Sequence, residues 1–279
     1  MTKNIKKIWN KGDLFIWLTG AALALSLILT AGLLLIILAN GMSLFWPDQM
    51  VRFTLKDRQV LQGQVAHRES IPEPGAPPGT EQKFRIQIKQ GNRDVYGTDF
   101  VWIDEASIAV REIPSDVVVV ERREWGDFYG KIVEVKKDKR SLATGFKDGM
   151  NALSAELPRI QDIYDEMNHV AKIDVGKTNY YLEKSRLKLK KLANNGIKNG
   201  KKVEALQKEI AGLQAEYQEQ EQKLIDLRNQ LTGSIIISIP DGCTQEIPLS
   251  KVVRVYTPNT LGYLGKVKFF FAKTWEFIY

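Results

Sequence analysis

Residue types that perform catalysis or hold metal ions are sparse in this chain of 279 residues and do not cluster along it. His67 and His169 lie far apart, without the neighbouring cysteines or paired carboxylates that a zinc site needs. Cys243 is the single cysteine, so the chain cannot form an intrachain disulfide. The sequence also lacks a phosphate-binding glycine loop and a G-x-S-x-G nucleophile motif. We therefore predict no catalytic residue, no cofactor, no metal site and no enzymatic activity.

The chemistry that the sequence does offer is electrostatic attraction. Cationic residues gather between positions 184 and 202, and a surface of one charge sign speeds the approach of an oppositely charged partner. We call this set the basic tip. It consists of Lys184, Arg186, Lys188, Lys190, Lys191, Lys198, Lys201 and Lys202. We predict that the basic tip docks an acidic partner surface and not nucleic acid; a solvated helix face is the alternative interpretation.

A second docking hypothesis concerns the residues after Val117–Val120, a β-branched run that predicts a buried strand. Arg122, Arg123 and Trp125 follow this run. Arginine and tryptophan are enriched among the residues that dominate binding energy at protein interfaces, so we predict that these side chains contact a partner. The alternative interpretation is an edge strand whose aromatic residues pack on the sheet.

A long apolar segment must anchor these residues at a membrane. Residues 14–47 carry no charged side chain, and a helix needs about 20 apolar residues to cross a bilayer. We predict a transmembrane helix over residues 14–40. A signal peptide would have a shorter apolar core of about 7–15 residues and a small-residue cleavage site, so we predict an uncleaved anchor.

The charges that flank this helix predict its orientation. Basic residues remain on the cytoplasmic side of a membrane. The lysines that precede the helix are Lys3, Lys6, Lys7 and Lys11. We therefore predict that residues 1–13 are cytoplasmic, and that most of the chain lies in the periplasm beside the bacterial inner (plasma) membrane.

Two parts of the chain, residues 48–135 and 233–258, alternate apolar and polar residues as antiparallel strands do. The predicted hairpins pair Arg52–Leu55 with Val60–Val65, Phe84–Ile88 with Val95–Tyr96, and Ile235–Ile239 with Ile247. Similar strands and a proline, Pro114 or Pro258, follow the second and third hairpins, which indicates a repeated β unit. The proline-rich stretch 71–79 predicts an extended surface loop.

Residues 145–232 change to a helical period. In the second half, apolar residues follow a heptad repeat with Gln220 at the one polar position: Val203, Leu206, Ile210, Leu213, Tyr217, Leu224, Leu227 and Leu231. The first half has two registers, one through Leu153, Leu157, Ile160, Tyr164, Met167 and Ala171, the other through Thr178, Leu182, Ser185, Leu189 and Leu192. An additional four-residue step between Ala171 and Val175 predicts a bend. Turn residues at 194–200 predict an antiparallel coiled-coil hairpin.

The last segment, residues 260–279, mixes aromatic residues with Lys266, Lys268 and Lys273. It is too charged to span a bilayer, and its composition is typical of an amphipathic helix that lies along a membrane interface. We expect this helix to lead toward a second transmembrane segment that this sequence does not include.

Several segments together resemble the N-terminal part of a bacterial phosphate ABC-transporter permease, the A-type subunit in its long form. The matching segments are Met42–Pro47, Pro74–Glu81, Gly91–Gly97, Asp99–Asp104, Glu121–Gly126 and Trp275–Phe277. The resemblance implies a subunit with six spanning helices and a periplasmic insertion in its first outer loop. It also implies a C-type permease subunit, ATPase subunits and a periplasmic phosphate-binding protein as partners. The remaining spans lie outside this sequence, so no phosphate-pathway residue is carried over.

A periplasmic adaptor is the alternative function. Adaptors that link an inner-membrane pump to an outer-membrane channel also combine an N-terminal anchor with a coiled-coil hairpin between β segments. Such a protein would usually end in a soluble β domain and not in an aromatic segment. In either case the sequence predicts an α+β membrane protein: an N-terminal transmembrane helix, a small antiparallel β domain, and an inserted antiparallel coiled-coil hairpin.

Overall fold

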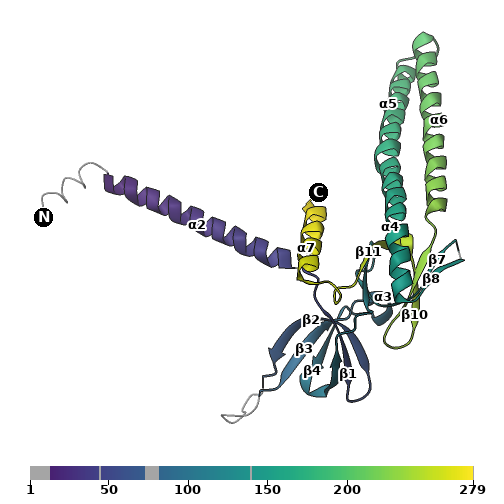
Figure 1. The fold of residues 1–279 in the computed structure, drawn as a ribbon. Coiled ribbons are helices and arrows are strands. Elements are labelled where there is room, and N and C mark those ends of the chain that lie inside the picture. The colour runs from purple at the N-terminus through teal and green to yellow at the C-terminus, as the bar shows by residue number, and fades with distance from the viewer. Residues whose placement is uncertain (1–12, 44, 73–81, 139, 279) are drawn as a thin grey trace. The chain divides into compact units, whose positions relative to one another are not determined.

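The computed structural model describes residues 13–43, 45–72, 82–138 and 140–278. Within them the chain combines helices with antiparallel sheets, as the sequence predicted (Figure 1). It forms two compact units: Met1–Asp48 with Leu261–Tyr279, and Gln49–Thr260. We describe each by itself. The predicted cytoplasmic residues up to position 12, and positions 73–79 of the proline-rich stretch, lie outside the described residues.

The first unit contains two helices, α2 (Asp13–Ser43) and α7 (Tyr263–Ile278). In the part of the chain that the structure describes, α2 is the one helix that is long and apolar enough to cross a membrane, over Phe15–Gly41. The mean hydropathy there reaches 2.7, and none of these side chains is buried within the protein. A signal sequence meets the same criterion of length and composition.

Aromatic side chains connect the segment after α2 to α7. The ring centroids of Phe45 and Phe277 lie 5.2 Å apart, and Trp46 lies 6.2 Å from Tyr263 and 6.1 Å from Phe270. Such offset and tilted ring pairs are favourable beyond the area that they bury. The tail that the sequence predicted as a helix is helical, and one of its faces packs on residues that follow α2.

The second unit begins with a five-stranded antiparallel sheet. Its strands are β1 (Met50–Leu55), β2 (Val60–Ser70), β3 (Phe84–Lys89), β4 (Phe100–Asp104) and β5 (Ile108–Glu112). The strand order is β4-β3-β2-β1-β5, and a 3₁₀ turn, Glu105–Ser107, joins β4 to β5. The predicted hairpin of β1 and β2 is confirmed.

The predicted return strand at Val95–Tyr96 is wrong. Gly91 and Asn92 adopt left-handed φ angles of 57° and 52°, and the chain then forms a short helix, α3 (Arg93–Tyr96). The strand that pairs with β3 is β4. A left-handed pair of residues redirects the chain, and alternation of apolar residues alone does not reveal such a turn.

The second sheet contains β6 (Val118–Arg122), β7 (Phe128–Lys137), β8 (Arg140–Thr144), β9 (Ser234–Ser238), β10 (Thr244–Pro248) and β11 (Val252–Tyr256). Its order is β10-β9-β7-β6-β11, with β8 paired to β7. A 3₁₀ turn, Leu249–Lys251, joins β10 to β11. The buried strand after position 117 and the hairpin of β9 and β10 are confirmed. Sequence analysis did not predict β8.

The second sheet repeats the first. In each, successive strands form a meander, a 3₁₀ turn follows, and the last strand returns to pair with the first. The pairing of first and last strands shifts register at the same place, after Thr54 in one sheet and after Glu121 in the other. The pairing of second and third strands also shifts at matching positions, after Val65 and after Ile132.

Two glycines occupy equivalent places in this repeat. A Cβ atom on Gly130 of β7 would lie 2.5 Å from the carbonyl oxygen of Ser238, the last residue of β9. A Cβ atom on Gly63 of β2 would collide in the same way with the carbonyl oxygen of Lys89, the last residue of β3. Each site therefore needs a glycine because the backbones approach too closely for any side chain.

Three clusters of buried side chains hold this unit together. The first sheet packs around Val51, Phe53 and Ile88. The larger cluster joins the second sheet to the first half of α4 through residues such as Ile235, Leu153 and Ile160. A third cluster connects the sheets, because Met50 of β1 packs there with side chains from β6, from the residue that precedes it, from β7 and from β11. Those side chains are Val117, Val119, Tyr129 and Tyr256.

The long helices of the second unit are inserted between the second and third strands of the second repeat. They are α4 (Phe146–His169), a π-helix (Val170–Asp174), α5 (Val175–Asn194) and α6 (Lys201–Gln230). Gly196 has a φ of 78°, the left-handed conformation that commonly ends a helix. After this turn α6 lies alongside α5 (Figure 1). The proline-rich stretch occupies the corresponding connection of the first repeat.

Burial along α6 follows the predicted heptad. Every predicted position from Val203 to Leu231, Gln220 included, is buried or half-buried, and every other residue of α6 is exposed. The register in the first half needs one correction. Val170 is buried and Ala171 is exposed, because the π-helix adds a residue to one turn and moves Val170 to the inner face. This π-helix lies where the additional four-residue step was found, and the bend predicted there stays a prediction.

Candidate functional site

The side chains of the basic tip are all exposed, at the end of α5, in the turn and at the start of α6. Arg186 is paired with Glu183 at 2.8 Å, and the ammonium of Lys184 lies 5.7 Å from the ring of Tyr180. Among the described residues, the lysines of the basic tip form no ion pair. The structure therefore brings the predicted residues together as one solvated, positively charged end of the helical pair.

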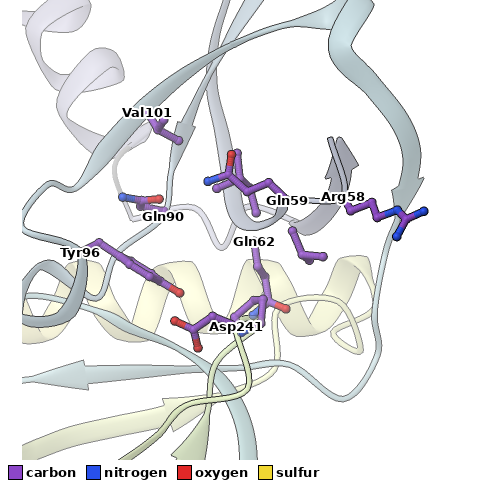
Figure 2. Close-up of a pocket in the computed structure, with 10 residues that line it drawn as sticks. Arg58, Gln59, Gln62, Gln90, Tyr96, Val101 and Asp241 are labelled. Carbon is purple, nitrogen blue, oxygen red and sulfur yellow. The ribbon is translucent and has the colours of Figure 1, made fainter. Parts of the chain in front are cut away.

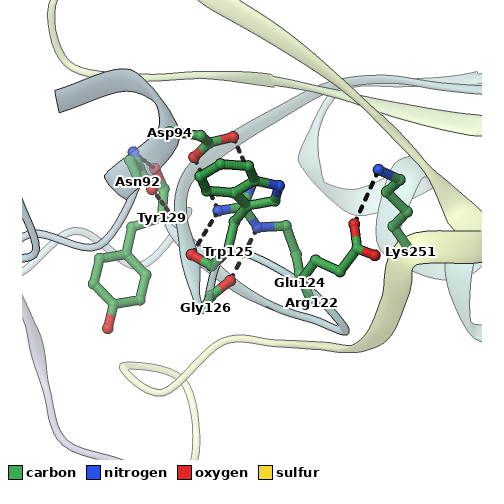
Figure 3. A network of polar contacts seen from close by, with 8 residues as sticks. All are labelled: Asn92, Asp94, Arg122, Glu124, Trp125, Gly126, Tyr129 and Lys251. Atoms are coloured by element: carbon green, nitrogen blue, oxygen red, sulfur yellow. Dashed lines mark hydrogen bonds and ion pairs between the residues drawn. The ribbon is translucent and has the colours of Figure 1, made fainter. Parts of the chain in front are cut away.

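Arg122 lies elsewhere in the unit, and its guanidinium has partners inside the protein. It donates to the carboxylate of Asp94 from Nη1 at 2.7 Å and from Nη2 at 2.9 Å (Figure 3). It also donates to the carbonyl oxygens of Gly126 and Trp125, and it lies over the ring of Phe128. Its side chain is 5% exposed. Arg122 therefore supports a turn, and its docking of a partner stays a prediction.

The Arg122 pair changes the acidity of its partner. Hydrogen bonds from Arg122 hold the pKa of the Asp94 carboxyl below its ordinary value, although partial burial opposes the shift. Charge-assisted, bidentate pairs of this kind are shorter and stronger than neutral hydrogen bonds. Asp94 belongs to α3 and Arg122 to β6, so this pair also joins the two repeated sheets.

The two other residues of the second docking hypothesis differ from each other. Arg123 stacks over the ring of Tyr164 in α4 at 3.5 Å and donates from Nε to the carbonyl oxygen of Ser250. Trp125 is 61% exposed and has a positive φ of 69° in the turn that Arg122 supports. Of the predicted set, Trp125 is thus the residue whose side chain is presented to solvent.

Asn92 makes a second connection between the sheets. Its side chain accepts from the backbone nitrogen of Tyr129 at 2.6 Å and donates to the backbone oxygen of the same residue at 3.0 Å (Figure 3). Burial, and then the neighbouring Asp127, raise the pKa of the Tyr129 hydroxyl far above its ordinary range. A second salt bridge, between Lys89 and Asp127 at 2.9 Å, lies beside this contact.

Two adjoining pockets lie where the turn between β1 and β2 faces the turn between β9 and β10. The larger has a volume of about 550 Å³ and the smaller about 350 Å³, and both are lined by Val60, Gln62 and Pro240. We call the two together the intersheet groove. The larger pocket is also lined by Arg58, Gln59, Leu61, Gln90, Tyr96, Val101 and Asp241 (Figure 2). The smaller is also lined by Arg52, Thr54, Lys131, Ser238, Ile239 and Gly242.

Polar groups from both repeats face the intersheet groove. Tyr96 of α3 lies opposite Asp241 (Figure 2). Burial, and then the charge of Asp241, raise the pKa of the Tyr96 hydroxyl to about 12, so it stays protonated and can donate a hydrogen bond. Sequence analysis did not predict these residues, since they come from turns of different repeats that share no motif or period.

No group of three or more histidine, cysteine or acidic side chains in the described ranges could hold a metal ion. His169 lies 3.9 Å from Asp174 beside the π-helix, and both side chains are exposed. Cys243 is an exposed free thiol.

Comparisons with known proteins found no match for the chain. No family model, no curated protein and no solved structure matches it.

Proposed function

We propose that the chain is the first membrane helix and the periplasmic insertion of a permease subunit in an ABC transporter that imports inorganic phosphate. The proposal combines the resemblance of the segments around Trp46, Gly91, Trp102, Trp125 and Trp275 with the geometry of the two units. In this interpretation the insertion is a scaffold or docking element and does not catalyse a reaction.

The structural observation that carries the proposal is the contact between the two ends of the second unit. The side chain of Asn259 accepts from the backbone nitrogen of Met50 at 2.8 Å and donates to its backbone oxygen at 2.7 Å. Asn259 also donates to the backbone oxygen of Pro114 at 2.7 Å. A unit whose first and last residues meet can be inserted into a loop of another protein without separating the flanking segments.

The two helices of the first unit support a place in a membrane. Apolar side chains along the whole of Phe15–Gly41 face outward, which is stable in lipid and costly in water. On α7, Leu264, Phe271 and Trp275 are exposed on one face, at a spacing that returns to the same side of a helix. Lysines accompany this apolar face, as in helices that lie at a membrane interface. We infer an uncleaved anchor with a cytoplasmic N-terminus.

We further propose that α5 and α6 form an antiparallel coiled coil, because the sheltered positions of α6 follow a heptad. Two polar positions on α5 face partners on α6: Thr178 and Glu216 are 3.1 Å apart, and Ser185 donates to Glu209 at 2.8 Å. Polar residues at such positions fix the register of a coiled coil. The hairpin would hold the basic tip away from the sheets, where an acidic partner can reach it.

The test is to purify the tagged, full-length native protein from detergent-solubilised membranes and to measure phosphate uptake by cells that lack it. We expect a C-type permease subunit and ATPase subunits to co-purify, and high-affinity phosphate uptake to be lost and then restored by the gene. Co-purification with an outer-membrane channel, together with normal phosphate uptake, would support the adaptor function and reject the permease proposal.

A further inference from the structure

The floor of the intersheet groove contains two groups that lack their usual partners. The guanidinium of Arg52 donates from Nη2 to the side-chain oxygen of Gln62 at 2.9 Å and from Nε at 3.3 Å. Among the described residues Arg52 has no carboxylate partner. Gln62 is 5% exposed, and its side-chain nitrogen has no hydrogen-bond partner there. Glu112 stands opposite Arg52 on β5 but forms no salt bridge with it. A half-buried cation that forms no ion pair and a buried N–H without an acceptor are both costly.

One kind of ligand would supply the missing partners of both Arg52 and Gln62. An acceptor oxygen satisfies the amide of Gln62, and a negative charge compensates Arg52. The orientation of the amide is set by its neighbour, because rotating it would place an NH₂ group against the guanidinium, where two donors would meet. The side-chain nitrogen of Gln62 can therefore be satisfied only by an acceptor other than Arg52.

Among the lining residues, those of the smaller pocket favour an anion. Lys131 lines the smaller pocket and is paired with Asp116 at 2.5 Å, and Arg58 lines the larger pocket. Asp241 is the one carboxylate among the lining residues, and it accepts from the backbone nitrogen of Cys243 at 2.8 Å in its own turn. The smaller pocket contains no carboxylate among its lining side chains, and it adds the hydroxyls of Thr54 and Ser238.

We propose that the intersheet groove binds a small oxyanion, a phosphate or a carboxylate, with Arg52 as its counter-ion and the amide of Gln62 as a hydrogen-bond donor. Both classes present two or more acceptor oxygens on one atom, which matches an arginine beside an amide. The smaller pocket holds the anionic group, and the larger pocket, with Tyr96 and Asp241, accommodates the rest of the molecule. The inference rests on the second unit alone and stands whether or not the chain serves phosphate import.

The test is isothermal titration of the full chain in detergent micelles. Inorganic phosphate and succinate are the two probes, and sodium chloride at matched ionic strength is the reference. We expect saturable binding of at least one probe beyond the chloride response. Saturation with phosphate alone assigns the site to phosphates, and saturation with succinate assigns it to carboxylates. No saturable response to either probe would overturn the proposal.

Two variants separate the site from a general effect of salt. Gln62→Glu gives Arg52 an internal counter-ion and removes the amide donor, so we expect the dissociation constant to rise at least about tenfold while the unfolding temperature is kept or raised. Arg52→Gln should weaken binding similarly and decides the question if Gln62→Glu does not fold. Arg93→Gln removes one exposed positive charge from α3 and should leave binding unchanged. Wild-type affinity in both groove variants would contradict the assignment.

Discussion

Asn92 and Tyr129 form a side-chain-to-backbone pair that joins the two repeated sheets. Both main-chain groups of Tyr129 are satisfied by the one amide of Asn92, at 2.6 Å and 3.0 Å. Asn92 holds a positive φ of 52°, which asparagine tolerates better than most residues. The same side chain thus fits a left-handed turn and caps a strand of the neighbouring sheet.

Removing this side chain should destabilise the second unit. We expect Asn92→Gly to lower the free energy of unfolding by about 1–3 kcal/mol, because the backbone N–H and C=O of Tyr129 lose their partners in a buried place. Glycine accepts the positive φ, so this variant isolates the hydrogen bonds from backbone strain. Thermal unfolding followed by circular dichroism measures the change. Unfolding at the wild-type temperature would show that water replaces the amide without cost.

The Arg122–Asp94 pair should make stability depend on pH in the acid range. The pKa of Asp94 is lowered in the folded protein by its hydrogen bonds to Arg122, so folding favours the ionised carboxylate. The contribution is complete above the ordinary value of 3.8 and is lost as the pH falls below it. We expect the gap in unfolding temperature between wild type and Asp94→Asn to be constant near neutral pH and to shrink below about pH 4.

An Asp162→Asn variant is the control for that comparison, because Asp162 is exposed on α4. It removes the same charge and should leave the acid dependence of the wild type intact. A gap between wild type and Asp94→Asn that stays constant down to about pH 2.5 would contradict the assigned origin of the shift.

The repeated glycines should be equally intolerant of a side chain. In Gly130→Ala the new Cβ would lie 2.5 Å from the carbonyl oxygen of Ser238, and in Gly63→Ala it would lie 2.6 Å from the side chain of Ile88. We expect each variant to lose about 1–3 kcal/mol of unfolding free energy through overpacking. Gly212→Ala in the interior of α6, where a Cβ meets open space, should instead gain about 0.5–1 kcal/mol.

Cys243 allows the orientation in the membrane to be tested without a substitution. It is the single cysteine of the chain and its side chain is exposed. If the second unit is periplasmic, a membrane-impermeant maleimide should label Cys243 in spheroplasts as fully as in lysed cells. A variant with Cys243→Ser and Thr2→Cys should be labelled after lysis alone. Labelling of Cys243 that requires lysis would place the second unit in the cytoplasm.

The basic tip should influence the rate of association with an acidic partner, which under the proposed function is the periplasmic phosphate-binding protein. Replacing Lys188, Lys190 and Lys191 with glutamine should slow association at about 50 mM salt. The association rate of this variant should also change less between about 50 mM and about 300 mM salt than that of the wild type. Lys147, Lys172 and Lys177 are exposed lysines of α4, the π-helix and α5, outside the basic tip. Replacing these three with glutamine removes the same charge and should slow association less. Equal rates in the two triple variants would reject a local role for the basic tip.

Much of the fold could be predicted because its signals are periodic. The heptad identified the sheltered face of α6, and alternation identified β1, β2, β9 and β10. The core position predicted at Ala171 was wrong by one residue. A heptad stutter and a π-helix leave similar apolar spacings in the sequence, but the π-helix places Val170 on the inner face. The false strand at Val95–Tyr96 arose because Gly91 and Asn92 turn the chain through their φ angles, which no apolar pattern records.

The candidate sites were harder to predict because their residues meet only in three dimensions. The pairing of Arg122 with Asp94 could not be predicted, because two strands, β4 and β5, separate the two residues along the chain. The intersheet groove depends on Gln62 and Pro240, which belong to different repeats. The basic tip could be predicted, since its residues are neighbours in sequence on either side of one turn.

The contact of Asn259 with Met50 and Pro114 has a consequence for how such a chain can change. Because the second unit is closed on itself at this point, it can be removed and replaced by a few residues while both flanking helices keep their ends close together. We therefore expect that a version of the protein without this unit would need only a short loop in its place.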